Sequence, residues 1–250
     1  MNSSRDTLFS ALSSDIETFR FDERVTRVFA DMIRRSVPGY ASVIAMTGVL
    51  GAEHIQPDSR VYDLGCSLGT SLIAIQNSVN VPCKLIGIDN SQAMITACRE
   101  NLSHLPEKQG VEIQLQCADI SQINIHNASL VVMHYTLQFI PPEQRLALLR
   151  KIARGLNPGG VLVLSEKLAF DDPKMEATLT RLYYDFKKHN GYSELEISRK
   201  RQALENVLIP ETEQTHIKRL QEAGFERVMS WFQCLNFHSF VAYKPLDTPV

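Results

Sequence analysis

The stretch VYDLGCSLGTS, residues 61–71, is the part of the sequence that decides the fold class. A short apolar run ends in an acid, and a loop with Gly65 and Gly69 then leads into a segment with helical spacing. Glycines in such a loop let the backbone come close to a ligand. Their spacing is not the Gly-x-Gly-x-x-Gly of dinucleotide sites. The stretch therefore predicts a strand, a ligand-binding loop and a helix, and it leaves the ligand open.

Outward from this loop, apolar strand-like runs alternate with segments of helical periodicity. Such alternation over about a hundred residues is typical of an α/β fold with a doubly wound, mostly parallel sheet of the Rossmann-like kind. Two apolar runs near the C-terminus, RVMSWFQCL and NFHSFVAYK, predict an antiparallel hairpin that brings the sheet to seven strands. The other strands are expected at 60–64, 83–89, 111–119, 128–135 and 161–167, and the intervening helices at 69–78, 92–104 and 141–156.

The remaining segments predict an N-terminal cover and a helical insertion. Residues 1–20 are expected to form a polar arm, followed by a helix that Asp22 caps and a second helix at 41–55. The mostly polar segment 171–210 predicts helices, one of them started by a Ser193–Glu196 capping box. We therefore divide the chain into residues 1–56, an arm and helices over the site, and residues 57–250, a ligand-binding domain that contains the 171–210 insertion.

Composition excludes several functional classes. The 250 residues carry a formal net charge of −2, so no basic field favours direct binding of nucleic acid. The five cysteines form no Cys-x-x-Cys pair, which argues against a disulfide scaffold or a zinc site. No His-Glu-x-x-His pattern or acidic cluster predicts a metal. No signal peptide or apolar run of membrane length is present, so we expect a soluble cytoplasmic protein without a membrane partner.

Acidic residues end the second and third predicted strands. Asp89 follows the Gly65 loop by 24 residues, where a carboxylate can accept hydrogen bonds from both ribose hydroxyls. Asp119 lies just past the next strand, where it can meet the exocyclic amine of an adenine. Either acid alone would be an ordinary turn or cap residue. Together with the glycine loop, they predict a site for an adenosine-containing ligand.

No residue pattern identifies a general base. The seven histidines are scattered, and His134, at the end of the fourth strand, is nearest to the expected site. A lone histidine there is more often a hydrogen-bonding wall residue than a base. The segment SRKRQALEN carries Arg199, Lys200 and Arg201. Consecutive side chains on a helix point in different directions, so this run is either a solvated basic face or a source of one or two cations for a carboxylate.

The motif Asp-x-Gly-x-x-x-Gly and the segment LNPGGVLVLSE resemble those of class I S-adenosylmethionine-dependent methyltransferases. A longer set of segments resembles one bacterial family of that superfamily, the carboxy-S-adenosyl-L-methionine synthases. These segments are RDTLFSA, FDERV, RSVPGY, VYDLGCSLG, IDNS, YTLQF, NPGG, LSEK, NGYSELEIS and WFQC. The resemblance implies a homodimeric transferase that converts S-adenosylmethionine and prephenate to carboxy-S-adenosylmethionine and phenylpyruvate. It also implies that a second enzyme uses the product to modify the wobble uridine of tRNA.

The resemblance also implies the site residues. Arg201 matches the arginine that pairs with the transferred carboxylate and is our candidate catalytic residue, ahead of Arg199 and Lys200. His134 stands where we expect asparagine, so its contact through side chain or backbone is left open. Cys66 is expected to fill space rather than act as a nucleophile. The residues expected to bind the cofactor are Tyr40, Gly65, Cys66, Ser67, Asp89, Asn90, Asp119, Ile120, His134 and Arg201.

The implied chemistry needs no protein base. A sulfonium acidifies its methyl group, and the ylide formed by deprotonation can capture carbon dioxide. Prephenate releases carbon dioxide and hydroxide as its ring becomes aromatic, so the substrate itself can supply the base. Two alternatives remain on sequence grounds. One is an ordinary S-adenosylmethionine-dependent methyltransferase acting on a small molecule or RNA, and the other is a non-catalytic cofactor-binding module.

Overall fold

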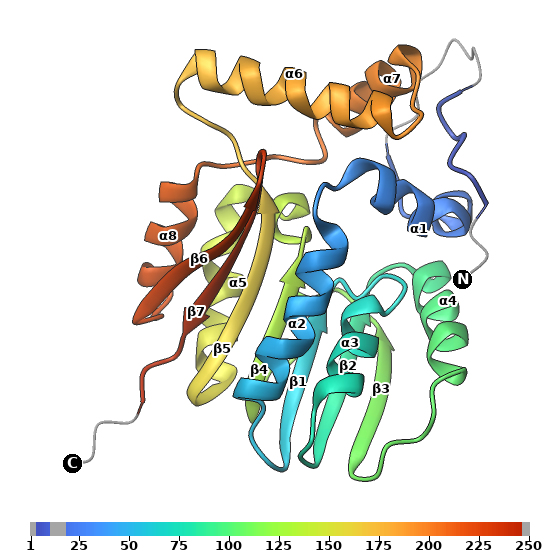
Figure 1. The fold of residues 1–250 in the computed structure, drawn as a ribbon. Coiled ribbons are helices and arrows are strands. Elements are labelled where there is room, and N and C mark those ends of the chain that lie inside the picture. The colour runs from blue at the N-terminus through green and yellow to red at the C-terminus, as the bar shows by residue number, and fades with distance from the viewer. Residues whose placement is uncertain (1–3, 11–18, 247–250) are drawn as a thin grey trace.

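The computed structural model describes residues 4–10 and 19–246 of the chain. Within these residues, seven strands form one sheet in the order β3-β2-β1-β4-β5-β7-β6 (Figure 1). Neighbouring strands among β1 to β5 are parallel, and β7 is antiparallel to both β5 and β6. The predicted fold class is therefore confirmed. The strands are β1 (Ser59–Leu64), β2 (Cys83–Asp89), β3 (Val111–Cys117), β4 (Ala128–His134), β5 (Leu156–Lys167), β6 (Arg227–Cys234) and β7 (Phe237–Tyr243).

Helices cover both faces of the sheet (Figure 1). On one face lie α2 (Tyr40–His54), α3 (Thr70–Ser78) and α4 (Gln92–Ser103). On the other lie α5 (Pro142–Gly155) and α8 (Glu213–Glu222). Because β1, β4 and β5 are covered on both faces, their sequences are nearly continuous apolar runs.

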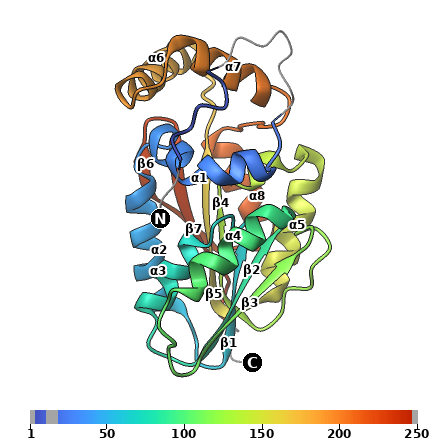
Figure 2. The same ribbon diagram turned by 90° about the vertical axis from the view of Figure 1, so that its right-hand side faces the viewer.

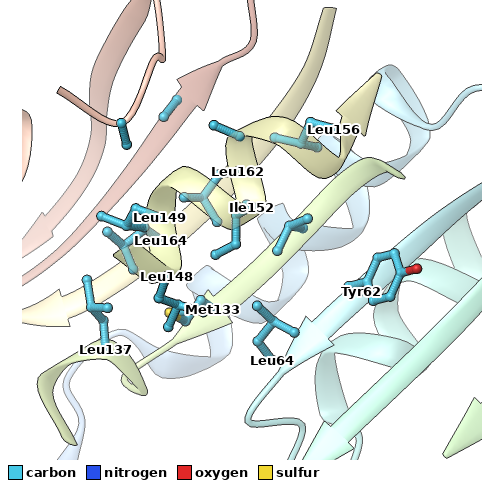
Figure 3. Close-up of a cluster of buried hydrophobic side chains, with 14 of the residues drawn as sticks. Tyr62, Leu64, Met133, Leu137, Leu148, Leu149, Ile152, Leu156, Leu162 and Leu164 are labelled. Atoms are coloured by element: carbon cyan, nitrogen blue, oxygen red, sulfur yellow. The ribbon is translucent and has the colours of Figure 1, made fainter. Parts of the chain in front are cut away.

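The packing of α5 on the sheet shows how the central strands divide their side chains. Leu162 and Leu164 of β5 pack with Leu149 and Ile152 of α5 (Figure 3). The alternate residues of β5, such as Val163, belong to the cluster under α2 and α3. This period of two places one apolar layer on each side of the sheet and leaves the carboxyl ends of the strands to form the site.

A third group of helices lies beyond the carboxyl edge of the parallel strands. It consists of α1 (Glu23–Ser36), α6 (Pro173–His189) and α7 (Glu194–Leu204) (Figures 1 and 2). The predicted helix starts are confirmed, because Asp22 accepts a hydrogen bond from the Val25 N–H and the Ser193–Glu196 capping box is formed.

One local expectation was wrong, and another is refined. Most of residues 4–10 is exposed or partly exposed, as expected of a polar arm, but Asp6 is only 1% exposed and its N–H donates to Asp31. Residues 1–3 and 11–18 of the predicted arm lie outside the described residues. Strand β5 begins at Leu156 rather than at 161, because the NPGG segment continues the strand past a shift in its pairing with β4.

Candidate active site

The loop between β1 and α3 lies where the strand order reverses, between β1 and β4. Ligands of open α/β sheets bind at this point. The N–H groups of Gly65 and Cys66 both donate to the Ile88 carbonyl, which bends the loop over the end of β2. Gly65 has φ +84°, and a Cβ there would lie 2.3 Å from Thr136 Oγ1. Glycine at this position is therefore required by the close approach of the β4–α5 loop.

Asp89 connects this loop to the next one. Its two carboxylate oxygens accept the N–H groups of Ser67, at 3.0 Å, and of Ser91, at 2.9 Å. Burial raises the pKa of Asp89, and the two N–H donors oppose that shift. The carboxylate is thus fixed at the end of β2, and each oxygen keeps a further lone pair for a ligand hydroxyl.

Asp63, at the end of β1, was not among the predicted site residues. Its side chain is 2% exposed, and Oδ2 has no hydrogen-bond partner among the described residues. Burial, reinforced by the neighbouring Asp89, raises the pKa of Asp63 to about 7. An acid that closes a buried strand directly before a glycine loop is the sequence signal that identifies it. Its orphaned oxygen is an acceptor for a buried donor or cation.

A single cavity of about 750 Å³ collects the predicted residues. This volume lies in the range of ligand pockets. All ten predicted residues line it, so the structure brings together positions that the sequence spreads over α2, the strand ends and α7. Their individual contacts with a ligand remain predictions. The lining includes Tyr40, Gly65, Cys66, Ser67, Asp89, Asn90, Asp119, Ile120, His134 and Arg201.

The β3 side of the cavity combines a polar edge with an apolar floor. Asp119 is exposed, and its Oδ1 accepts the Ser121 N–H at 2.7 Å. Ile120 is buried beside it, and Asn90 is exposed after β2. A carboxylate beside an apolar surface suits a flat heterocycle with an exocyclic amine.

His134 is held in a buried chain of hydrogen bonds. Thr47 Oγ1 donates its proton to the Val43 carbonyl and lies 2.8 Å from His134 Nε2, so Nε2 must carry the donated hydrogen. His134 Nδ1 then accepts from Ser165 Oγ, 2.8 Å away, which in turn pairs with Ser239. Burial lowers the pKa of His134 to about 3. The ring is a neutral wall group and not a proton acceptor for catalysis.

Two tyrosines face the cavity from opposite elements. Tyr135 follows β4 with φ +56°, a conformation that costs energy for an aromatic residue. Its buried hydroxyl has no hydrogen-bond partner among the described residues. Tyr40 shares a 2.7 Å hydrogen bond with Thr70 Oγ1, and its ring centroid lies 6.4 Å from that of Tyr135. Burial raises the pKa of Tyr40 to about 12, so its hydroxyl remains protonated. Tyr135 begins the YTLQF segment but was not among the predicted site residues.

Four cations line the side of the cavity under α6 and α7, namely Lys167, Lys187, Lys200 and Arg201. Lys200 is buried, donates to Ser36 Oγ at 3.1 Å and lies 3.9 Å from Asp6. Arg201 is exposed. Of the three consecutive cations in SRKRQALEN, Arg199 does not line the cavity, whereas Lys200 and Arg201 do. Lys167 and Lys187 were not predicted.

The structure gives less support to cysteine nucleophilic catalysis and to a metal site. A hydrogen bond with Cys98, together with burial, raises the pKa of Cys66, so its thiol remains protonated and is a poor nucleophile. No group of three or more His, Cys, Asp or Glu side chains in residues 4–10 and 19–246 is arranged to hold a metal ion. None of the described helices has the length and apolar character needed to cross a membrane.

Comparison with known proteins defines the class. The family model of the methyltransferase domain matches residues 61–160. A putative O-methyltransferase from Nostoc punctiforme superimposes with a TM-score of 0.61 at 17% identity, covering 89% of this chain and 59% of that one. Magnesium protoporphyrin IX methyltransferase from Synechocystis, solved with bound SAH, gives a TM-score of 0.59 at 17% identity, covering 85% of this chain and 87% of that one. The chain thus has the fold of S-adenosylmethionine-dependent methyltransferases.

Curated relatives identify the family within this class. The carboxy-S-adenosyl-L-methionine synthase of Trichlorobacter lovleyi is 54% identical over 98% of this chain and 100% of its own length. The synthase of the same name from Shewanella oneidensis is 51% identical over the same shares. The chain belongs to the carboxy-S-adenosyl-L-methionine synthase family. The predictions of family, enzyme class and type of cofactor are therefore confirmed.

Proposed function

We propose that this enzyme converts S-adenosylmethionine and prephenate to carboxy-S-adenosylmethionine and phenylpyruvate. The observation that carries the proposal is the division of one cavity into two chemical halves. Asp63, Asp89 and Asp119 line the part at the ends of β1, β2 and β3. The part under the insertion is lined by the four cations of β5, α6 and α7 and by one acid, Glu205. The first half suits a ligand with an ammonium group and a ribose, and the second suits an organic anion.

The acidic half fits S-adenosylmethionine. The orphaned Oδ2 of Asp63 is a partner for the ammonium of the amino-acid tail, and Asp89 for the ribose hydroxyls. Asp119 and Ile120 form the edge and the floor for adenine. When bound, S-adenosylmethionine supplies a methyl carbon that its sulfonium has made acidic. The protein's contribution there is to hold the tail, ribose and base in a fixed orientation.

The cationic half fits a substrate that brings its own base. Aromatisation of prephenate releases carbon dioxide and hydroxide, and the hydroxide removes one methyl proton to give water. The electron pair left on carbon then forms the new bond to carbon dioxide, so no oxidant or reductant is needed. The neutral, hydrogen-bonded His134 is consistent with this route, because it leaves no histidine base beside the loop. The protein's tasks are positioning, exclusion of water and charge pairing with carboxylates.

Further parts of the proposal follow the family resemblance. Arg201 pairs with the transferred carboxylate, since a guanidinium matches a carboxylate as a planar fork. Residues 1–56 and 171–210 act as a cover over a domain formed by the rest of 57–250. The enzyme acts as a cytoplasmic homodimer, and its product serves the carboxymethylation of the tRNA wobble uridine without direct binding of nucleic acid by this chain.

Mass spectrometry of the ligand that co-purifies with the protein tests the proposal. We expect a compound one carboxyl group heavier than S-adenosylmethionine, and phenylpyruvate on incubation with both substrates. Arg201→Ala should weaken retention of the carboxylated compound at least tenfold more than that of S-adenosylmethionine, with Arg201→Lys in between. Unmodified cofactor and no phenylpyruvate would support an ordinary methyltransferase or a binding module instead.

A further inference from the structure

Two lysines from different elements meet at one aromatic ring in the cationic half of the cavity. Lys167 ends β5, and Lys187 lies in the last turn of α6. Their Nζ atoms lie 5.1 Å and 4.6 Å from the centroid of the Tyr183 ring. Both lysines line the cavity. The sheet and the helical insertion therefore each contribute one cation to the same place.

These two lysines have no ion-pair partner in the part of the chain that the structure describes. Lys187 is nevertheless only 6% exposed. Lys200 makes a useful contrast, because it is equally buried but has Asp6 and Ser36 as partners. A buried ammonium without a carboxylate destabilises the folded protein, and a cation–π contact offsets only part of that cost. The arrangement is costly unless an anion joins it.

The charges around Lys187 also favour the binding of an anion. Burial, followed by the nearby cations Lys200 and Lys167, lowers the pKa of Lys187 well below its usual range, and only the more weakly acting Asp6 opposes this. Burial and Arg201 also lower the pKa of Lys167, against the attraction of Glu176. Arg201 and the lysines therefore share one electrostatic environment.

The walls next to the lysines are aromatic. The Phe237 ring lies 5.3 Å from Tyr183 and 5.8 Å from Tyr135, measured between centroids. Tyr184 and Phe237 also line the cavity. A slot of this kind accommodates a six-membered carbon ring, while the cations at its edge attract carboxylates.

We propose that Lys167 and Lys187 bind the retained carboxylate of a dianionic, ring-bearing second substrate, while Arg201 faces the carboxylate that is lost. The inference rests on the proposed function, because it assigns the transferred carboxylate to Arg201. It adds the orientation of the second substrate, whose ring lies along Tyr183 and Phe237 between the two anchoring points. The two lysines are thus specificity-determining residues.

Lys187→Met tests this inference, because the methionine keeps an apolar stem over Tyr183 and removes only the ammonium. We expect the KM for prephenate to rise about tenfold to a hundredfold, and more in the Lys167→Met/Lys187→Met double variant. The Kd for S-adenosylmethionine should stay within about twofold. The melting temperature of Lys187→Met should be unchanged or higher, since a buried unpaired charge has been removed. Lys188→Met is the matched control, because Lys188 is the next residue of α6, is exposed and pairs with Glu194.

Phenylpyruvate separates the two anchoring points, because it keeps only the retained carboxylate. Its Kd, measured by calorimetry on protein saturated with S-adenosylmethionine, should rise about tenfold or more in Lys187→Met and stay within about twofold in Arg201→Ala. Two results would overturn the subsite and leave the proposed function intact. One is that the lysine double variant keeps the wild-type KM for prephenate and the wild-type Kd for phenylpyruvate. The other is that its melting temperature falls while its binding of both compounds is unchanged. A different result would overturn the proposed function and leave the subsite. In it, the wild-type protein binds prephenate but forms no phenylpyruvate, and the lysine variants bind prephenate more weakly than the wild type.

Discussion

The hydroxyl of Tyr192 donates a 2.5 Å hydrogen bond to the carboxylate of Asp6, although the two residues are 186 positions apart. Arg35 of α1 lies over the Tyr192 ring at 3.8 Å and donates to the Asp6 carbonyl. Lys200 of α7 lies 3.9 Å from the same carboxylate. Segment 4–10 therefore ties α1 to α7, and this connection holds the helix that carries Arg201.

Asp6→Ala should destabilise the protein because it leaves Lys200 buried without its carboxylate and Tyr192 without its acceptor. Loss of one partner from a buried charged network costs about 3 kcal/mol, and we expect a loss of this size in the free energy of unfolding in urea. The control is Asp185→Ala, which removes an exposed carboxylate that pairs with the exposed Arg181 at 3.8 Å and should cost less than about 0.5 kcal/mol. Equal losses in the two variants would show that segment 4–10 contributes nothing to the connection.

Binding of S-adenosylmethionine should release a proton from Asp63. Burial and the neighbouring Asp89 raise the pKa of Asp63 to about 7, so its carboxyl is largely protonated at pH 6. An ammonium at Oδ2 favours the charged carboxylate and lowers that pKa. Calorimetry at pH 6 in two buffers of different ionisation enthalpy should show release of nearly one proton per site. Asp63→Asn should bind more weakly and without this release, and equal proton release in both proteins would contradict the assignment.

His134 should make the stability of the protein sensitive to acid. Burial lowers its pKa to about 3, whereas an unfolded histidine titrates near 6.5, so the unfolded chain binds more protons between these values. Stability from this group is therefore complete above pH 6.5 and falls as the pH drops. From pH 8 to pH 5, the difference in unfolding free energy between wild type and His134→Asn should shift by about 2 kcal/mol in favour of the variant. Parallel pH profiles would mean that the imidazole is not held neutral by the fold.

The sequence predicted the sheet well because local pattern and burial agree there. The run CKLIGID was expected as a strand over 83–89, and β2 has these bounds. Such strands are covered on both faces, so their apolar runs are uninterrupted and easily recognised. The start of β5 was missed because NPGG has the composition of a turn. Leu156 nevertheless pairs with Ala128 of β4, and after an irregularity in which Gly159 has φ +72° the pairing resumes with Val161 opposite Leu130.

The acidic half of the cavity was also predictable from the pattern of the strands. Acids at the ends of β1, β2 and β3 must lie at one edge of a parallel sheet, so Asp63 is as predictable from the sequence as Asp89 and Asp119. The cationic half was not predictable by this reasoning. Lys187 and Tyr183 lie on an insertion helix whose position over the sheet depends on contacts such as that of Asp6 with Tyr192. No spacing along the chain reveals such a contact.

Gly65→Ala should weaken S-adenosylmethionine binding strongly while lowering the stability of the fold only moderately. Two costs combine at this position, the φ of +84° and a Cβ only 2.3 Å from Thr136 Oγ1, so the loop must move away from its place beside Asp63. Gly224→Ala is a matched control, because Gly224 has φ +103° and a Cβ there would meet nothing within 4 Å. Each substitution should lower stability by about 1 to 3 kcal/mol through its backbone conformation. Only Gly65→Ala should weaken S-adenosylmethionine binding tenfold or more in calorimetry, and unchanged affinity would show that the loop does not need this close packing to form the site.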